Sequence, residues 1–172
     1  MKTQNLKINE IFYSLQGESS RIGIPTTFIR LTGCPMRCSY CDTAYAFSEG
    51  KKLTFDEIFN EIKKYKTNFI TVTGGEPLAQ ELCKVFLSQL VKFGYEVSLE
   101  TGGAISIKDI DKKVKIILDI KTPGSGEVEN NYWENLSLIK KQDEIKIVIT
   151  DRHDYEWAKD LIQKKGLYMK YD

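Results

Sequence analysis

Residues 26–43, TTFIRLTGCPMRCSYCDT, join a β-type run to three closely spaced cysteines. Residues 26–33 read as a strand that runs directly into a loop. On that loop Cys34, Cys38 and Cys41 are separated by three and then two residues, although the whole chain has only four cysteines. Such crowding indicates a site at the end of the strand rather than scattered packing residues.

Strand-like and helix-like segments alternate along the rest of the chain. The segment 54–65 carries Thr54 and Glu57 in capping-box spacing, followed by apolar residues at helical intervals. The next segment, 68–75, is a continuous apolar strand that ends in two glycines. The helix after it has one apolar face, made of Leu78, Leu82, Val85, Phe86 and Leu90. Further strands are predicted at 96–103, 114–126, 145–150 and 167–171, and helices near 131–141 and 154–165.

This alternation predicts an α/β fold with a parallel sheet of repeated βα units. The sheet could be open and doubly wound, or it could be an arc of a barrel. In both architectures ligands bind at the carboxyl ends of the strands. The cysteine loop and the turns at 73–77, 100–103 and 121–126 all follow strand ends. We therefore expect these segments to meet at one rim of the sheet.

The composition narrows the class of protein. A chain of 172 residues suits one domain, taken here as residues 1–172, and 25 basic against 24 acidic residues give a formal charge of +1. This balance indicates neither a nucleic-acid nor a membrane partner. The N-terminus has no export signal and no apolar run could span a bilayer, which favours a cytoplasmic protein. In a reducing cytosol, clustered thiols more often hold metal or take part in catalysis than form disulfides.

Three thiolates on one loop can hold three corners of a cubane iron–sulfur cluster, which normally takes four ligands. One iron would then keep an open position for a small molecule. Structural zinc is an alternative, but its fourth ligand would have to be distant Cys83 or the single histidine, His153. Cys83 is more typical of a small packed side chain, and His153 of a helix start or a surface. Three unrelated buried cysteines are the remaining interpretation.

The spacing Cys-x3-Cys-x2-Cys, with aromatic Tyr40 before the last cysteine, resembles the signature of the radical S-adenosylmethionine (SAM) enzymes. A second feature follows in the right order, because residues 73–77 read TGGEP at a strand end. Its two glycines expose backbone groups that could bind the amino group of a cofactor amino acid. The resemblance implies a partial TIM-like barrel and a [4Fe-4S] cluster whose open iron binds SAM. It also implies one-electron cleavage of SAM to methionine and a 5′-deoxyadenosyl radical.

Two further stretches narrow this resemblance. Residues 12–18 read FYSLQGE, residues 23–34 read GIPTTFIRLTGC, and Cys41 is followed by Asp42 and Thr43. This run is similar to the 7-carboxy-7-deazaguanine synthase family of queuosine biosynthesis, and the similarity extends from Ile11 to about Thr150. It implies a carbon–nitrogen lyase that converts 6-carboxy-5,6,7,8-tetrahydropterin to 7-carboxy-7-deazaguanine with loss of ammonia.

The resemblance assigns the cluster, the substrate and a metal ion to named residues. The cluster ligands would be Cys34, Cys38 and Cys41. The pterin pocket would be lined by Leu15, Gln16, Gly17 and Glu18. Arg30 would pair with the substrate carboxylate, which its planar fork suits. Thr43 would place its hydroxyl on Mg²⁺, with Asp42 in support.

A second set would bind SAM: Tyr40, Thr73, Gly74, Gly75, Glu76, Glu100 and Lys121. Within this set the residues of TGGEP would hold the methionine end, Glu100 the ribose and Lys121 the carboxylate. Plainer structural roles compete with these assignments. Residues 16–18 could form a simple turn, Arg30 a strand-edge ion pair, and residues 42–43 a helix cap. Glu100 could merely flank a turn and Lys121 could be solvated.

Two other functions stay open at this point. An enzyme that installs a glycyl radical on a partner protein would share the cluster and TGGEP, but it is not expected to combine LQGE with Arg30. A non-catalytic iron–sulfur or zinc module would supply a fourth protein ligand. The resemblance further implies a homodimer and an electron donor such as flavodoxin or ferredoxin. Family members usually continue past the last strand, so we expect a different closure, a second subunit or a missing tail to account for the short C-terminus.

Overall fold

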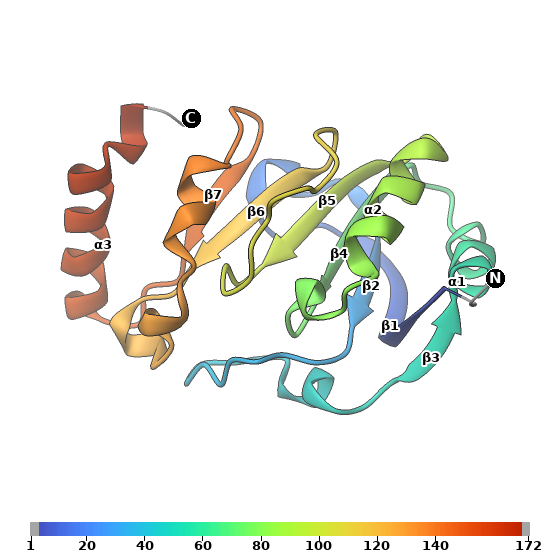
Figure 1. The fold of residues 1–172 in the computed structure, drawn as a ribbon, viewed down its shortest axis with the longest axis horizontal. Coiled ribbons are helices and arrows are strands. Elements are labelled where there is room, and N and C mark those ends of the chain that lie inside the picture. Colours follow the sequence, from blue (N-terminus) through green and yellow to red (C-terminus); the bar gives the residue numbers. More distant parts are fainter. Residues whose placement is uncertain (1–3, 170–172) are drawn as a thin grey trace.

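A seven-stranded sheet with the order β3-β1-β2-β4-β5-β6-β7 forms the frame of the molecule (Figure 1). The computed structural model describes residues 4–169. The strands are β1 Asn5–Leu15, β2 Pro25–Leu31, β3 Lys51–Thr54, β4 Phe69–Gly74, β5 Glu96–Thr101, β6 Lys115–Ile120 and β7 Glu144–Ile147. Neighbouring strands from β2 to β7 run parallel, whereas β1 is antiparallel to β2 and β3. The predicted α/β class with a largely parallel, unclosed sheet is confirmed.

Three α-helices accompany this sheet in the described part of the chain: α1 Phe55–Ile62, α2 Cys83–Lys92 and α3 Arg152–Lys165. The predicted capping box opens α1, because Thr54 accepts from the Glu57 backbone and Glu57 accepts from the Thr54 backbone. In Figure 1, α2 lies over β4 and β5, α1 lies beside β3, and α3 lies beyond β7. No helix among residues 4–169 has the length and apolar character needed to cross a membrane.

The helix predicted after Pro77 differs in detail. Residues Pro77–Ala79 form a 3₁₀ turn, and the α-helix begins only at Cys83. Val85 was predicted on the core face, but this is wrong, since its side chain is 40% exposed. Leu87 takes that place, because positions 83, 86, 87 and 90 form the i, i+3, i+4, i+7 stripe of a helix that packs on one side.

Two predicted elements in the last third of the chain are wrong. The helix predicted near 131–141 is a 3₁₀ turn, Trp133–Ser137. The strand predicted at 167–171 begins as another 3₁₀ turn, Leu167–Met169, and its last two residues lie outside the described range. The turn predicted at 121–126 is confirmed, because β6 ends at Ile120 and 3₁₀ turns follow at Pro123–Ser125 and Val128–Asn130.

The two faces of the sheet differ in polarity. Ile29, Val72 and Leu99 are fully buried in the apolar core that includes side chains of α1 and α2. On the other face, the strand register sets polar side chains next to each other, in the pairs Arg30–Thr73, Thr71–Ser98 and Asp119–Lys146. Because side chains alternate between faces along a strand, one face is left to bind a ligand while the other carries the core.

Candidate active site

A cleft of about 670 Å³ lies at the carboxyl ends of the parallel strands. It is lined by the cysteine loop after β2, by the ends of β4, β5, β6 and β7, and by residues 16–18 after β1. The predicted meeting of these segments at one rim is confirmed. Every predicted site residue lines the cleft except Leu15 and Glu76. A separate hollow of about 720 Å³ between β1, β3 and α1 contains none of these residues.

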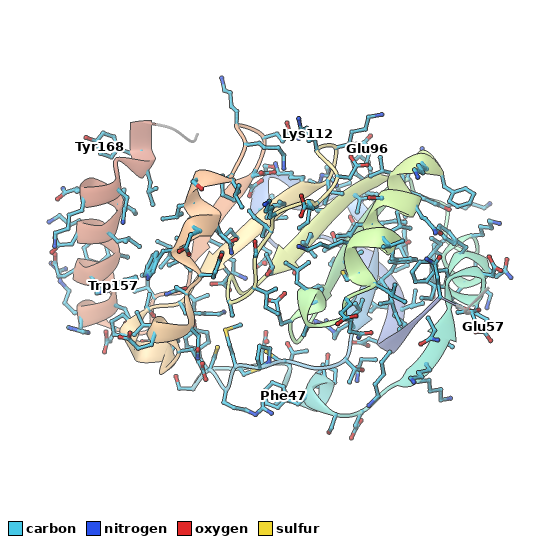
Figure 2. The ribbon with its side chains drawn as sticks, in the orientation of Figure 1. Phe47, Glu57, Glu96, Lys112, Trp157 and Tyr168 are labelled. Atoms are coloured by element: carbon cyan, nitrogen blue, oxygen red, sulfur yellow. The ribbon has the colours of Figure 1, made fainter. Side chains whose placement is uncertain are left out.

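The three clustered cysteines line the cleft as free thiols, and each is partly exposed. Burial raises the pKa of Cys34 and of Cys38, although the nearby Lys121 ammonium opposes the shift at Cys38. Thiols of this kind give up their protons when a metal binds, because the metal ligand is the thiolate. The segment after the cysteines ends at Phe47, which Figure 2 shows at the lower edge of the molecule.

The two residues considered as a fourth zinc ligand lie elsewhere. Cys83 is fully buried at the start of α2, where burial raises the pKa of its thiol far above the usual value. His153 is exposed near the start of α3, which is capped by Asp151. Neither residue lines the cleft, so the cleft offers a set of three thiols. The prediction that Cys83 is a packed core residue is confirmed.

The cleft fits a polar ligand beside an iron–sulfur cluster. Two buried polar atoms, the Tyr40 hydroxyl and Asp119 Oδ1, have no hydrogen-bond partner within residues 4–169. Buried polar groups are rarely left unpaired, and both residues line the cleft, so polar groups of a bound molecule would satisfy them. Three thiols without a fourth are also the donor set of a cluster that leaves one iron open to a ligand.

Gly75 allows the end of β4 to lie close to the cysteine loop. A Cβ on Gly75 would lie 2.4 Å from the Gly33 carbonyl oxygen and 2.7 Å from Cys34 Cβ. The Gly75 amide instead donates to the Leu31 carbonyl at 3.2 Å, and the Glu76 amide to the Gly33 carbonyl at 2.7 Å. The glycines of TGGEP therefore let β4 lie directly against the backbone that leads into Cys34.

Glu76 is buried beneath the cleft and hydrogen-bonds to two of the segments that form it. Its side chain is fully buried and accepts from the Leu78 amide at 3.0 Å, the Thr101 hydroxyl at 2.8 Å and the Gly102 amide at 2.8 Å. Burial raises the pKa of Glu76, while these hydrogen bonds and Lys121 oppose the shift. The carboxylate thus ties the turn after β4 to the end of β5 instead of facing the cleft.

Replacing Glu76 with alanine is expected to lower the free energy of unfolding by about 3 kcal/mol, because it leaves a cavity, two buried donors and one half-buried donor without an acceptor. Glu76→Gln is expected to cost less, since its amide oxygen still accepts. Urea denaturation of the apoprotein measures both variants. A Glu76→Ala protein within about 0.5 kcal/mol of the wild type, the range of ordinary surface changes, would contradict this role.

A network of hydrogen bonds orients the floor of the cleft. Gln16 is buried and donates to Thr71 Oγ1 at 3.3 Å and to Glu100 Oε1 at 3.2 Å. Glu100 also accepts from Thr73 at 3.0 Å. Burial raises the pKa of Glu100, and the nearby Glu18 carboxylate adds to the shift. Gln16 and Glu100 thus contact each other within the cleft, in addition to their places in a turn and at a strand end.

Charged side chains line one wall of the cleft. Lys121 pairs with Asp119 at 3.0 Å, and Lys146 pairs with Glu18 at 2.8 Å. Burial lowers the pKa of Lys121, but Asp119, Cys38 and Tyr40 together outweigh this effect and the net shift is upward, so the ammonium is cationic. Lys121 is only 8% exposed, which excludes the solvated alternative. Sequence reasoning missed Asp119 and Lys146, although strand alternation puts Asp119 on the same face as Lys121.

Arg30 and Thr43 line the cleft, and each makes a hydrogen bond to a neighbouring carboxylate. Arg30 Nε donates to Glu10 Oε1 at 2.7 Å, so the alternative ion pair exists, and the guanidinium also lies 5.9 Å from the Tyr45 ring centre. Thr43 donates to Asp42 Oδ1 at 2.6 Å. Thr43 directly precedes the 3₁₀ turn Ala44–Phe47, but its side chain makes no capping hydrogen bond, so the alternative of a side-chain cap from Thr43 is wrong. Leu15 is 61% exposed and does not line the cleft.

Comparison with known proteins places this cleft in a family. The model of the radical SAM superfamily matches residues 28–163. The 7-carboxy-7-deazaguanine synthase of Koribacter versatilis is 46% identical over 167 residues, covering 96% of this chain and 74% of the relative. The synthase of Chlorobaculum tepidum is 44% identical, covering 96% and 76%, and that of Thermoplasma acidophilum 37%, covering 92% and 77%.

A solved structure agrees on the fold. QueE from Escherichia coli superposes with a TM-score of 0.77 at 24% identity, covering 92% of this chain and 78% of that one. The chain spans about three quarters of the length of these relatives. The cysteine loop, the TGGEP turn and the similarity along nearly the whole length all indicate the same family. The chain belongs to the radical SAM superfamily and, within it, to the 7-carboxy-7-deazaguanine synthase family.

Proposed function

We propose that this protein is a 7-carboxy-7-deazaguanine synthase that converts 6-carboxy-5,6,7,8-tetrahydropterin to 7-carboxy-7-deazaguanine with loss of ammonia. The single observation that carries the proposal is the cleft itself, which unites the three thiols with Arg30 and with residues 16–18. A glycyl-radical activating enzyme needs the thiols but not this second set. The relatives that are named as synthases support the same choice.

The cofactors are a [4Fe-4S] cluster and SAM, as in the superfamily. The thiolates of Cys34, Cys38 and Cys41 would hold the cluster, which supplies the electron that splits SAM and so starts hydrogen-atom abstraction from the substrate. Glu100 is aimed by Thr73 and Gln16 as a hydrogen-bond acceptor for ribose hydroxyls. The cationic Lys121 is suited to the carboxylate of SAM.

The substrate would bind by complementary charge. The Glu10 carboxylate and two aromatic rings, those of Phe12 and Tyr45, hold the Arg30 guanidinium, which can pair with the substrate carboxylate. Gln16, Gly17 and Glu18 offer donors and acceptors for the pterin. Polar contacts of this kind would fix the orientation of the substrate relative to the reacting atoms.

Five further parts of the proposal come from the sequence and from the family resemblance. Mg²⁺ would bind the Thr43 hydroxyl, with Asp42 in support. A flavodoxin or ferredoxin would donate the electron, and the enzyme would act in the cytoplasm as a homodimer. Residues 1–172 would act as one radical SAM domain.

Product formation tests this function. The protein is reconstituted anaerobically with iron and sulfide and given SAM, Mg²⁺, dithionite and 6-carboxytetrahydropterin, and 7-carboxy-7-deazaguanine is sought by mass spectrometry. We expect product that requires both SAM and the pterin. Slow 5′-deoxyadenosine without product would reject this substrate but keep the superfamily chemistry. Neither compound from iron-loaded protein would favour a non-catalytic carrier.

A further inference from the structure

Asp154 on α3 is a fully buried carboxylate that the chemistry above does not use. Its oxygens accept from the Thr122 hydroxyl at 2.9 Å, the Gly124 amide at 2.8 Å, and the Thr150 amide and hydroxyl at 3.2 and 2.5 Å. Burial alone would raise the pKa of Asp154, but the hydrogen bonds from Thr150, Gly124 and Thr122 lower it to about 2. The helix has a separate cap, Asp151, which accepts from the Asp154 amide at 2.8 Å.

The loop after β6, residues 122–127, packs directly against the Asp154 carboxylate. A Cβ on Gly124 would lie 2.5 Å from Asp154 Oδ2 and 2.4 Å from Thr150 Oγ1. The carboxylate therefore fixes the loop by direct contact as well as by hydrogen bonds. Ser125 continues the same turn, and its hydroxyl donates to the Thr122 carbonyl at 2.5 Å.

The same loop contacts the segment that carries the cysteines. The Ser39 amide donates to the Ser125 carbonyl at 2.9 Å, and the Ser39 hydroxyl donates to the Gly124 carbonyl at 2.7 Å. The Arg37 amide donates to Glu127 Oε1 at 2.5 Å. These contacts lie on both sides of Cys38, so the loop after β6 borders the backbone between the second and third thiols.

The cysteine segment has little regular structure to set its own position. Residues 34–43 contain no helix or strand. Its internal contacts include a turn, in which the Cys41 amide donates to the Cys38 carbonyl at 3.1 Å, and a bond from Arg37 Nη1 to the Cys34 carbonyl at 2.8 Å. The distance between the thiols, on which cluster binding depends, is therefore set largely by neighbours such as Ser125.

We propose that Asp154 is a positioning residue for the iron–sulfur cluster: it fixes the loop 122–127, which in turn fixes the peptide between Cys38 and Cys41. This inference rests on the cluster of the proposed function, although not on its substrate. A carboxylate is suited to the task because it only accepts hydrogen bonds. Asparagine has the same shape but would turn an N–H₂ group toward one of the donors.

Iron release tests the proposal with a readout that does not require turnover. Reconstituted wild-type, Asp154→Asn and Asp151→Ala proteins are exposed anaerobically to an iron chelator, and loss of the cluster absorbance is followed. Both variants weaken the start of α3, but only Asp154→Asn loosens the loop 122–127. We expect Asp154→Asn to release iron about 10-fold faster, the lower end of the effect of removing support around metal ligands, and Asp151→Ala to match the wild type.

A second variant removes a contact between the loop 122–127 and the cysteine segment. Ser39→Ala removes the hydroxyl bond to Gly124 and leaves α3 intact, so it is expected to speed iron release without changing the thermal midpoint of the apoprotein. In the double variant with Asp154→Asn the two effects should be less than additive, because both act through one contact.

Three outcomes would overturn the proposal. In the first, Asp154→Asn releases iron as slowly as Asp151→Ala does. In the second, Ser39→Ala behaves as the wild type while Asp154→Asn does not. In the third, the two substitutions are fully additive. A protein that holds iron normally but makes no 7-carboxy-7-deazaguanine instead contradicts the proposed substrate and leaves this inference intact.

Discussion

Replacing any one of Cys34, Cys38 and Cys41 with alanine is expected to reduce both SAM cleavage and product formation to background. Each thiol would supply one corner of the proposed cluster, and no other thiol lines the cleft within the described residues. Iron and sulfide content of the reconstituted proteins is the direct measurement, with 5′-deoxyadenosine release as the functional one. Iron is expected to fall to background because two thiolates do not retain a cubane cluster.

Cys83→Ala is the matched control for these variants. Its thiol is packed in the core at the start of α2, away from the cleft. We expect it to cost about 1 kcal/mol of stability for the buried volume it removes, and to leave iron content unchanged. Loss of iron in Cys83→Ala would instead indicate a four-cysteine site. A single variant of the loop that still binds iron and cleaves SAM would refute the assignment of that thiol.

The parallel part of the sheet could be predicted because each of its strands is a short apolar run that ends in a glycine, proline or turn signal. β1 could not. Leu6 and Ile8 are buried in the core, but the pairing of β1 with β2 shifts between Ile8 and Glu10, after which Ile11 packs against the core. This bulge breaks the alternation on which strand recognition depends. β3 has only four residues, KKLT, and forms the edge of the sheet.

The candidate site could be predicted where its residues are close in sequence. The cysteine loop and TGGEP each carry their signal within a few positions. The ion pair of Glu18 with Lys146 joins residues 128 apart, and only the strand order brings them together. Glu76 shows the same limit, because its burial follows from the direction in which the chain turns after β4. The sequence motif indicates that Glu76 belongs to the site, but not which way its side chain points.

Replacing Gly75 with alanine is expected to disable the site through the backbone alone, without removing any ligand. The added methyl would lie 2.4 Å from the Gly33 carbonyl oxygen and 2.7 Å from Cys34 Cβ, closer than atoms can approach. The cysteine loop must therefore move away from β4. We expect stability to fall by about 1–3 kcal/mol from overpacking. SAM cleavage is expected to fall about 100-fold, the effect of a misplacement of about 1 Å.

The control for Gly75→Ala is Gly94→Ala, at the turn between α2 and β5. Gly94 has a φ of +89° and open space around its Cβ position, so alanine there costs about 1 kcal/mol of backbone strain without touching the site. Urea unfolding of both apoproteins, followed by 5′-deoxyadenosine release from both reconstituted proteins, separates the two effects. If general instability were the cause, the two variants would lose SAM cleavage in proportion to their lost stability. If contact between β4 and the cysteine loop is the cause, Gly94→Ala retains the wild-type rate while Gly75→Ala loses it even at temperatures where it remains folded.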